Sequence, residues 1–153
     1  MSAFNAGANA FLSSQYKEKY ICPNPTTERG ASLQVSAHPT LPLIIYPSGK
    51  FVVVRNLNDP ADSFIYRGHG HATTVAKFSP NGFWVASADV SGKVRVWSWD
   101  NPEHLTKLET SVFAARVYDL DWDSESKKLA VCGDGTGILV KCITWDTGNT
   151  AGE

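Results

Sequence analysis

Hydrophobic and polar residues alternate along most of this chain in short runs that turn residues separate. The runs at 43–46 and 51–55 are rich in β-branched and aromatic residues, and "PSGK" between them predicts a hairpin. A second hairpin is predicted for 74–78 and 83–88, because the intervening "SPNG" carries Asn-Gly at its tip. No segment keeps a helical period for long, so the pattern predicts an all-β chain. Further strands are expected at 93–99, 117–122, 128–133 and 138–145.

The predicted strands recur with a regular period. Pro39 and Pro80 occupy equivalent positions about 41 residues apart, and Phe78 and Trp122 lie about 44 residues apart. A period of roughly 40–45 residues with four short strands per unit is typical of WD-repeat β-propeller blades. The sequence therefore predicts two to three blades of such a propeller.

The middle unit carries the residues that usually join such a blade internally. His69 of a Gly-His pair precedes Phe78 by about nine residues, Ser87 follows on the second strand, and Trp97 on the third. A buried imidazole and indole need hydrogen-bond partners, and a Ser or Thr and an Asp usually supply them. The position of that aspartate, about six residues before Trp97, holds Ser91. A hydroxyl carries no charge, so we expect a weaker network than in an average blade.

Composition places the chain among ordinary globular proteins. Hydrophobic residues make up 42% and charged residues 19%, which excludes a disordered class. The net charge of −1 gives no bulk reason to expect nucleic acid or an anionic membrane as partner. The start of the chain lacks a signal-peptide pattern, and no window approaches a membrane span. We expect a cytoplasmic protein.

Metal, disulfide and cofactor chemistry finds little support. Cys22, Cys132 and Cys142 are odd in number and form no C-x-x-C pair, so neither a disulfide framework nor a zinc site is implied. His69 and His71 could supply two metal ligands on one strand face, but no further His or Cys cluster completes a shell. No cofactor is expected.

Two patterns could indicate an enzyme. His69, Ser87 and Asp89 could form a hydrolase triad, but no G-x-S-x-G turn accompanies them, and an internal blade network is favoured. "GDGTG" at 133–137 resembles a phosphate-binding loop, but no Lys-Ser/Thr follows it. We expect a chain that is not an enzyme.

Several ordered motifs carry a more specific resemblance. The stretches "PSGKFVVVRNLNDP" (47–60), "HGHATTVAKFSPNGFWVASADVSGKVRVW" (69–97) and "DLDWDSESKKLAVCGDG" (119–135) resemble the N-terminal part of the actin-interacting protein 1 family, WD-repeat cofactors of cofilin. The resemblance implies blades of a seven-bladed propeller in a longer chain. It also implies actin filaments and cofilin (actin depolymerising factor) as partners, filament disassembly as function, and the actin cytoskeleton as location.

One loop departs from the family. Its members usually carry a glutamate between two glycines after the second strand of this unit, followed by a basic and aromatic insertion. Here Asp134 keeps the charge, and only "TGILVKC" follows. We expect Asp134 to contact a partner, with Lys127 and Lys128 as nearby charged candidates on the preceding turn.

An array of this size cannot close a propeller ring. Apolar faces around 52–54 and 138–143 should therefore be exposed at its two ends, and the chain is expected to need further blades or another chain to fold. The expected units are an N-terminal segment 1–27, with an outer strand of a closing blade near 19–25, a first blade 28–66, a second blade 67–110 and an incomplete third blade 111–153.

Four functions stay open at this point. The resemblance favours a non-enzymatic actin regulator that assists cofilin. The alternative is a generic WD-repeat scaffold that serves another protein complex. A hydrolase using His69 and Ser87 is the third, and a shortened product without function is the fourth.

Overall fold

The computed structural model describes residues 22–101 and 103–152. Within these ranges every regular element is a strand, so the all-β prediction is confirmed. No helix in the described part could therefore cross a membrane. The strands are β1 (Ser36–Ala37), β2 (Leu43–Ser48), β3 (Phe51–Asn56), β4 (Ser63–Tyr66), β5 (Thr73–Phe78), β6 (Trp84–Asp89), β7 (Lys93–Ser98), β8 (Thr106–Ser111), β9 (Val117–Trp122), β10 (Lys128–Gly133), β11 (Val140–Thr144) and β12 (Thr150–Gly152).

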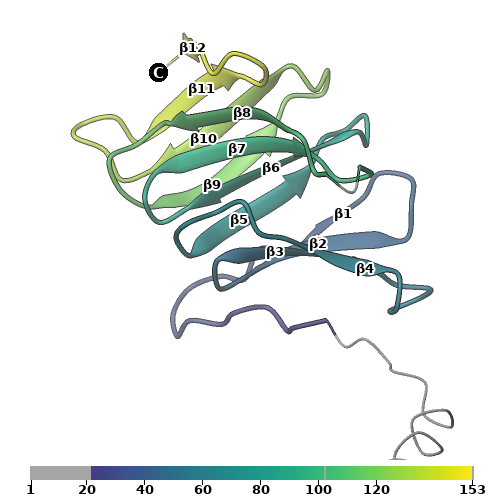
Figure 1. The fold of residues 1–153 in the computed structure, drawn as a ribbon. Coiled ribbons are helices and arrows are strands. Elements are labelled where there is room, and N and C mark those ends of the chain that lie inside the picture. The colour runs from purple at the N-terminus through teal and green to yellow at the C-terminus, as the bar shows by residue number, and fades with distance from the viewer. Residues whose placement is uncertain (1–21, 102, 153) are drawn as a thin grey trace, which may run out of the picture.

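The strands form three four-stranded antiparallel sheets, each an up-and-down meander. Their orders are β1-β2-β3-β4, β5-β6-β7-β8 and β9-β10-β11-β12, which we call the first, second and third sheets. The sheets lie face to face in chain order, with the second between the other two (Figure 1). This is the arrangement of successive propeller blades, as the repeat period predicted.

Two layers of apolar side chains hold the stack together. Ile45, Val52, Val85 and Trp97 belong to the layer between the first and second sheets. The layer between the second and third sheets contains Val75, Val94, Val96, Leu120, Leu129 and Val131. Because the second sheet packs on both faces, every residue of β6 from Val85 to Asp89 is buried.

The outermost strand of each sheet was not located from the sequence. In β8, for example, only Leu108 is buried, so the strand shows no clear alternation. The third sheet has a fourth strand, β12, although we expected the third blade to be incomplete. β12 is short and fully exposed, and it pairs with β11 through Cys142 and Ile143.

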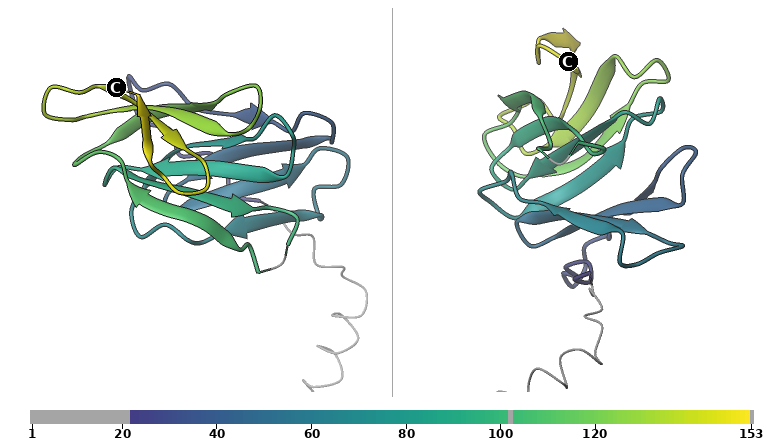
Figure 2. Two further views of the ribbon diagram at one scale, coloured as in Figure 1. Left: turned by 90° about the horizontal axis from the view of Figure 1, so that it is seen from above. Right: turned by 45° about the vertical axis from the view of Figure 1, so that its right-hand side comes forward.

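The expectation of two exposed apolar ends is wrong for the first sheet. Val52 and Val54 pack toward the second sheet, and Val53 is buried on the opposite face together with Cys22 and Tyr46. The chain from Cys22 onward covers that face, and it lies at the other end of the stack from β12 (Figures 1 and 2). In the third sheet Leu139 and Val140 are exposed, by 65% and 54%, whereas Ile143 is buried.

Residues 22–28 cover the first sheet without forming a strand. The Tyr46 hydroxyl donates to the Pro23 carbonyl at 2.8 Å, and the Ser48 hydroxyl donates to the Asn24 carbonyl at 2.9 Å. Residues 19–21 of the expected outer strand near 19–25 lie outside the described residues, and residues 22–25 form no strand.

Candidate functional site

A buried chain of hydrogen bonds joins the strands of the second sheet. His69 Nδ1 lies 2.8 Å from Asp89 Oδ2, and His69 Nε2 lies 2.7 Å from Ser87 Oγ. The indole N–H of Trp97 donates to the same Ser87 oxygen at 3.0 Å. The side chains of Asp89, His69, Ser87 and Trp97 are all buried, and the polar atoms that make these hydrogen bonds have protein partners in place of water.

One set of protonation states satisfies every bond in this network. If His69 carries its proton on Nδ1, it donates to the Asp89 carboxylate, and Nε2 accepts from the Ser87 hydroxyl. Burial lowers the pKa of His69, although the neighbouring carboxylate of Asp89 opposes this shift. Burial raises the pKa of Asp89, but hydrogen bonds from Ser91 and His69 outweigh it, and the pKa lies below its usual value. The network therefore holds a neutral imidazole beside an ionised carboxylate.

We expected a weaker network because Ser91 stands in the aspartate position, but Asp89 supplies a carboxylate to His69. Ser91 does not contact His69; its hydroxyl and its backbone N–H both donate to Asp89 Oδ1. Asp89 supplies the carboxylate from the last position of β6, two residues after Ser87. Alternate residues of a strand face the same side, so the alternation in 84–89 places Asp89 on the same side as Ser87. Counting six residues back from Trp97 did not identify Asp89.

This arrangement of Asp89, His69 and Ser87 has the connections of a hydrolase triad but cannot serve as one. Ser87 is 0% exposed, and its oxygen already accepts from Trp97. A nucleophile must reach its substrate, so the burial makes this a structural network. His71 is exposed, and no group of three potential metal ligands occurs among the described residues.

Asp134 lies on the surface at the end of the third sheet where β10 ends and β9 begins. The hydroxyl of Tyr118 donates to both carboxylate oxygens of Asp134, at 3.0 and 2.9 Å. The guanidinium of Arg116 lies 5.9 Å from the centre of the Tyr118 ring and pairs with Glu28 at 3.2 Å. We call these four residues, Glu28, Arg116, Tyr118 and Asp134, the Arg116 surface.

Sequence reasoning found only Asp134 of the Arg116 surface. Arg116 and Asp134 are brought together because the Asp134 backbone N–H donates to the Arg116 carbonyl at 2.8 Å. The antiparallel pairing of Val117 with Gly133 places these two positions side by side. Tyr118 could have been suspected as a large aromatic residue that its strand leaves exposed.

Lys127 and Lys128 do not lie near Asp134, contrary to our expectation. They lie at the turn before β10, whereas Asp134 follows its last residue. Six residues of an extended strand separate these ends by about 16 Å. Lys127 pairs with Glu125 at 2.8 Å, and the Lys127 and Lys128 backbone N–H groups donate to Asp123.

A known family model matches part of this architecture. The model of the WD domain, G-beta repeat, matches residues 62–98, which contain β4 of the first sheet and β5, β6 and β7 of the second. Residues 62–98 form a WD repeat. The matched unit spans two sheets because each repeat in the sequence begins with the outermost strand of the preceding blade.

The chain is also similar to longer relatives over most of its length. It is 41% identical over 136 residues to WD repeat-containing protein 1 of Gallus gallus, and 41% identical over 140 residues to Actin-interacting protein 1-2 of Arabidopsis thaliana. These alignments cover 89% and 91% of this chain, but only 22% and 23% of the relatives. The expected resemblance to the actin-interacting protein 1 family is thus confirmed.

A solved structure shares the fold at lower sequence identity. The crystal structure of Saccharomyces cerevisiae Sqt1 matches with a TM-score of 0.61 and 18% identity, over 76% of this chain and 33% of that chain. At this identity the match supports the fold and no shared partner.

Proposed function

We propose that this chain is a non-enzymatic actin-binding module that assists cofilin (actin depolymerising factor) in the disassembly of actin filaments in the cytoplasm. The observation that carries this proposal is the 41% identity to an actin-interacting protein over nine-tenths of the chain. The Arg116 surface lies within the aligned length and offers a partly exposed cation beside an exposed carboxylate and an exposed aromatic ring.

The proposed activity requires surface contact and no covalent step. Exposed charges on a rigid sheet can select a partner by complementarity, and exposed Tyr and Arg side chains are enriched where partners bind. Asp134 is held by Tyr118, and Tyr118 in turn contacts Arg116, so the three groups present a fixed arrangement.

Co-sedimentation with actin filaments, with and without cofilin, tests the proposal. The chain should pellet more strongly with cofilin-decorated filaments than with bare filaments. Asp134→Asn should reduce the pelleted fraction about two- to fivefold, as expected for an exposed charge at an interface. Asp146→Asn is a matched control, because Asp146 is exposed in the turn after β11, at the opposite end of the same sheet.

Lys127→Gln tests the other candidate residues in the same assay. If only the Arg116 surface makes contact, this change should leave the pelleted fraction unchanged. Binding that cofilin does not strengthen would contradict the proposal. It would favour the alternative of a WD-repeat scaffold that serves another complex.

A further inference from the structure

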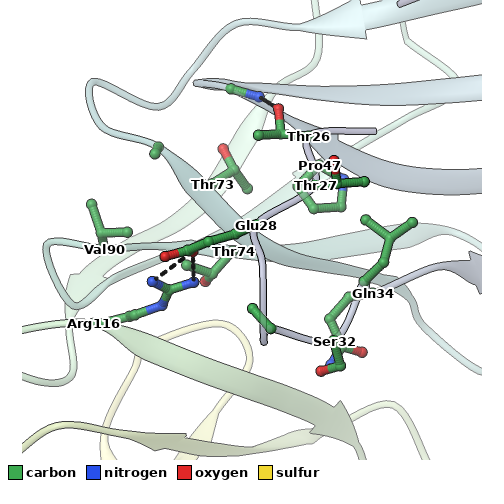
Figure 3. A pocket seen from close by; sticks show the side chains of 14 residues that line it. Thr26, Thr27, Glu28, Ser32, Gln34, Pro47, Thr73, Thr74, Val90 and Arg116 are labelled. Carbon is green, nitrogen blue, oxygen red and sulfur yellow. Dashed lines mark hydrogen bonds and ion pairs between the residues drawn. The ribbon is translucent and has the colours of Figure 1, made fainter. Parts of the chain in front are cut away.

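A cavity of about 150 Å³ lies beneath residues 26–34, next to the Arg116 surface. Its floor is formed by the turn at Gly49, the beginning of β5 and the turn at Val90. These pieces are tied together, since the Thr73 N–H donates to the Gly49 carbonyl and the Val90 N–H donates to the Ala72 carbonyl. Figure 3 shows Glu28 and Arg116 meeting at one side of this cavity.

The described lining of the cavity carries one cation and one anion. Arg116 and Glu28 are the charged residues of that lining, and most of the others are Thr, Ser, Gln and small apolar residues. The Glu28 side chain is 65% exposed. Both terminal nitrogens of Arg116 donate to a single oxygen, Glu28 Oε2, at 3.3 and 3.2 Å. This geometry lacks the two-oxygen fork of a strong Arg–carboxylate pair.

Two buried polar atoms of the same lining have no hydrogen-bond partner. They are Nε of Arg116 and Oγ1 of Thr73, whose residue is only 8% exposed. A buried polar atom without a partner is costly, so the chain's own groups leave this part of the lining incompletely hydrogen-bonded. Glu28 does not satisfy them from its position at the rim.

We propose that this cavity receives a carboxylate side chain of a protein partner, which Arg116 binds, and that Glu28 occupies Arg116 until the partner displaces it. A carboxylate fits because the cavity offers the terminal nitrogens of the Arg116 guanidinium beside uncharged Thr and Ser side chains. A phosphate dianion would require more positive charge than Arg116 supplies. The inference rests on the proposed function only for the identity of the partner, an acidic group on cofilin-decorated actin.

Acetate tests the cavity without any partner. The Arg116 Nε–H resonance of the ¹⁵N-labelled chain, assigned by its loss in Arg116→Lys, is followed during titration with acetate at constant ionic strength. Glu28→Gln removes the internal competitor, so acetate should bind this variant about two- to fivefold more tightly than the wild type. Glu103→Gln is the matched control and should titrate like the wild type, because Glu103 lies exposed in the loop between β7 and β8.

Three results would overturn the site. The first is a resonance that does not respond to acetate in either the wild type or Glu28→Gln. The second is equal acetate affinity in both proteins, which would show that Glu28 does not compete. The third is tighter binding of inorganic phosphate than of acetate to Glu28→Gln, which would exclude a carboxylate-selective cavity.

Co-sedimentation with cofilin-decorated filaments tests the partner separately. Glu28→Gln should pellet about two- to fivefold more readily than the wild type, and Arg116→Lys less readily. If the wild type pellets but Glu28→Gln changes nothing, the cavity has no part in partner binding. If the wild type does not pellet at all, the proposed function fails, and the acetate titration alone decides the cavity.

Discussion

Tyr66 and Trp97 stack face to face between the first and second sheets, with ring centres 3.9 Å apart and planes inclined by 6°. Tyr66 comes from β4 and Trp97 from β7, so the stack joins two blades. Trp97 also donates to Ser87 within its own blade. The same indole thus links the packing between blades to the buried hydrogen bonds within one.

Ser87→Ala should lower the free energy of unfolding by about 2 to 4 kcal/mol. The change removes the partner of both the Trp97 indole and the His69 imidazole, and each buried group left without a partner is costly. Guanidinium denaturation followed by circular dichroism measures the effect. Ser91→Ala should cost only about 1 kcal/mol, because backbone N–H groups still donate to Asp89. Equal costs for the two variants would contradict the central position of Ser87.

Stability should decrease as the pH falls below about 6.5. Burial lowers the pKa of His69 from its ordinary value of 6.5, so the unfolded chain takes up this proton before the folded chain does. The contribution of neutral His69 to the free energy of unfolding is therefore fully present above pH 6.5. It is lost as the pH falls through the folded pKa of His69. A second loss should begin below about 3.8, because the pKa of Asp89 is also lowered in the folded state.

Denaturation midpoints of the wild type at pH 7.5 and 5.5 measure the first of these losses. His69→Gln should be less stable at pH 7.5 but should lose most of the pH dependence between these values. His71→Gln should keep it, since His71 is exposed and outside the buried network. A wild type with the same midpoint at both pH values would show that His69 does not drive the effect.

The fold could be predicted largely because alternation and turn residues are local signals. "PSGK" located the turn between β2 and β3, and "SPNG" located the turn between β5 and β6. β8 was missed because Leu108 is its only buried residue, so the strand has no alternation of apolar and polar positions to reveal it.

The candidate site could be predicted only in part, because it depends on contacts that are distant in sequence. Asp134 stood out within a local motif. Its neighbour Arg116 comes from the start of β9, and Glu28 comes from a segment 88 residues before Arg116. Nothing in the local pattern of either residue indicates that the two meet.

Gly92→Ala should be much more destabilising than Gly137→Ala. Both glycines have a positive φ, 85° and 88°, so alanine carries a similar backbone strain of about 1–2 kcal/mol at either position. A β-carbon at Gly92 would collide with the backbone carbonyl of Phe113, whereas Gly137 has open space around it. We expect a loss of about 3 kcal/mol or more for Gly92→Ala, measured by guanidinium denaturation. Similar losses for the two variants would show that backbone conformation alone requires glycine.

Asp134→Asn should lower the pKa of Tyr118 toward its ordinary range. The hydrogen bond from the Tyr118 hydroxyl to the Asp134 carboxylate raises this pKa, because loss of the proton would break the bond and set two negative charges together. The ¹³Cζ resonance of Tyr118, followed through alkaline pH, reports the shift. Asp146→Asn should not move it, and an unchanged pKa in Asp134→Asn would mean that the two side chains are not in contact in solution.

The ion pair between Glu28 and Arg116 joins two parts of the chain that are synthesised 88 residues apart. Glu28 leaves the ribosome before Arg116 does, so this ion pair can form only after the loop that precedes β9 has been synthesised. Its nearer hydrogen bonds, from the Tyr46 and Ser48 hydroxyls, can form as soon as β2 is made. The covering segment can thus attach to the first sheet during synthesis before its ion pair with Arg116 is able to form.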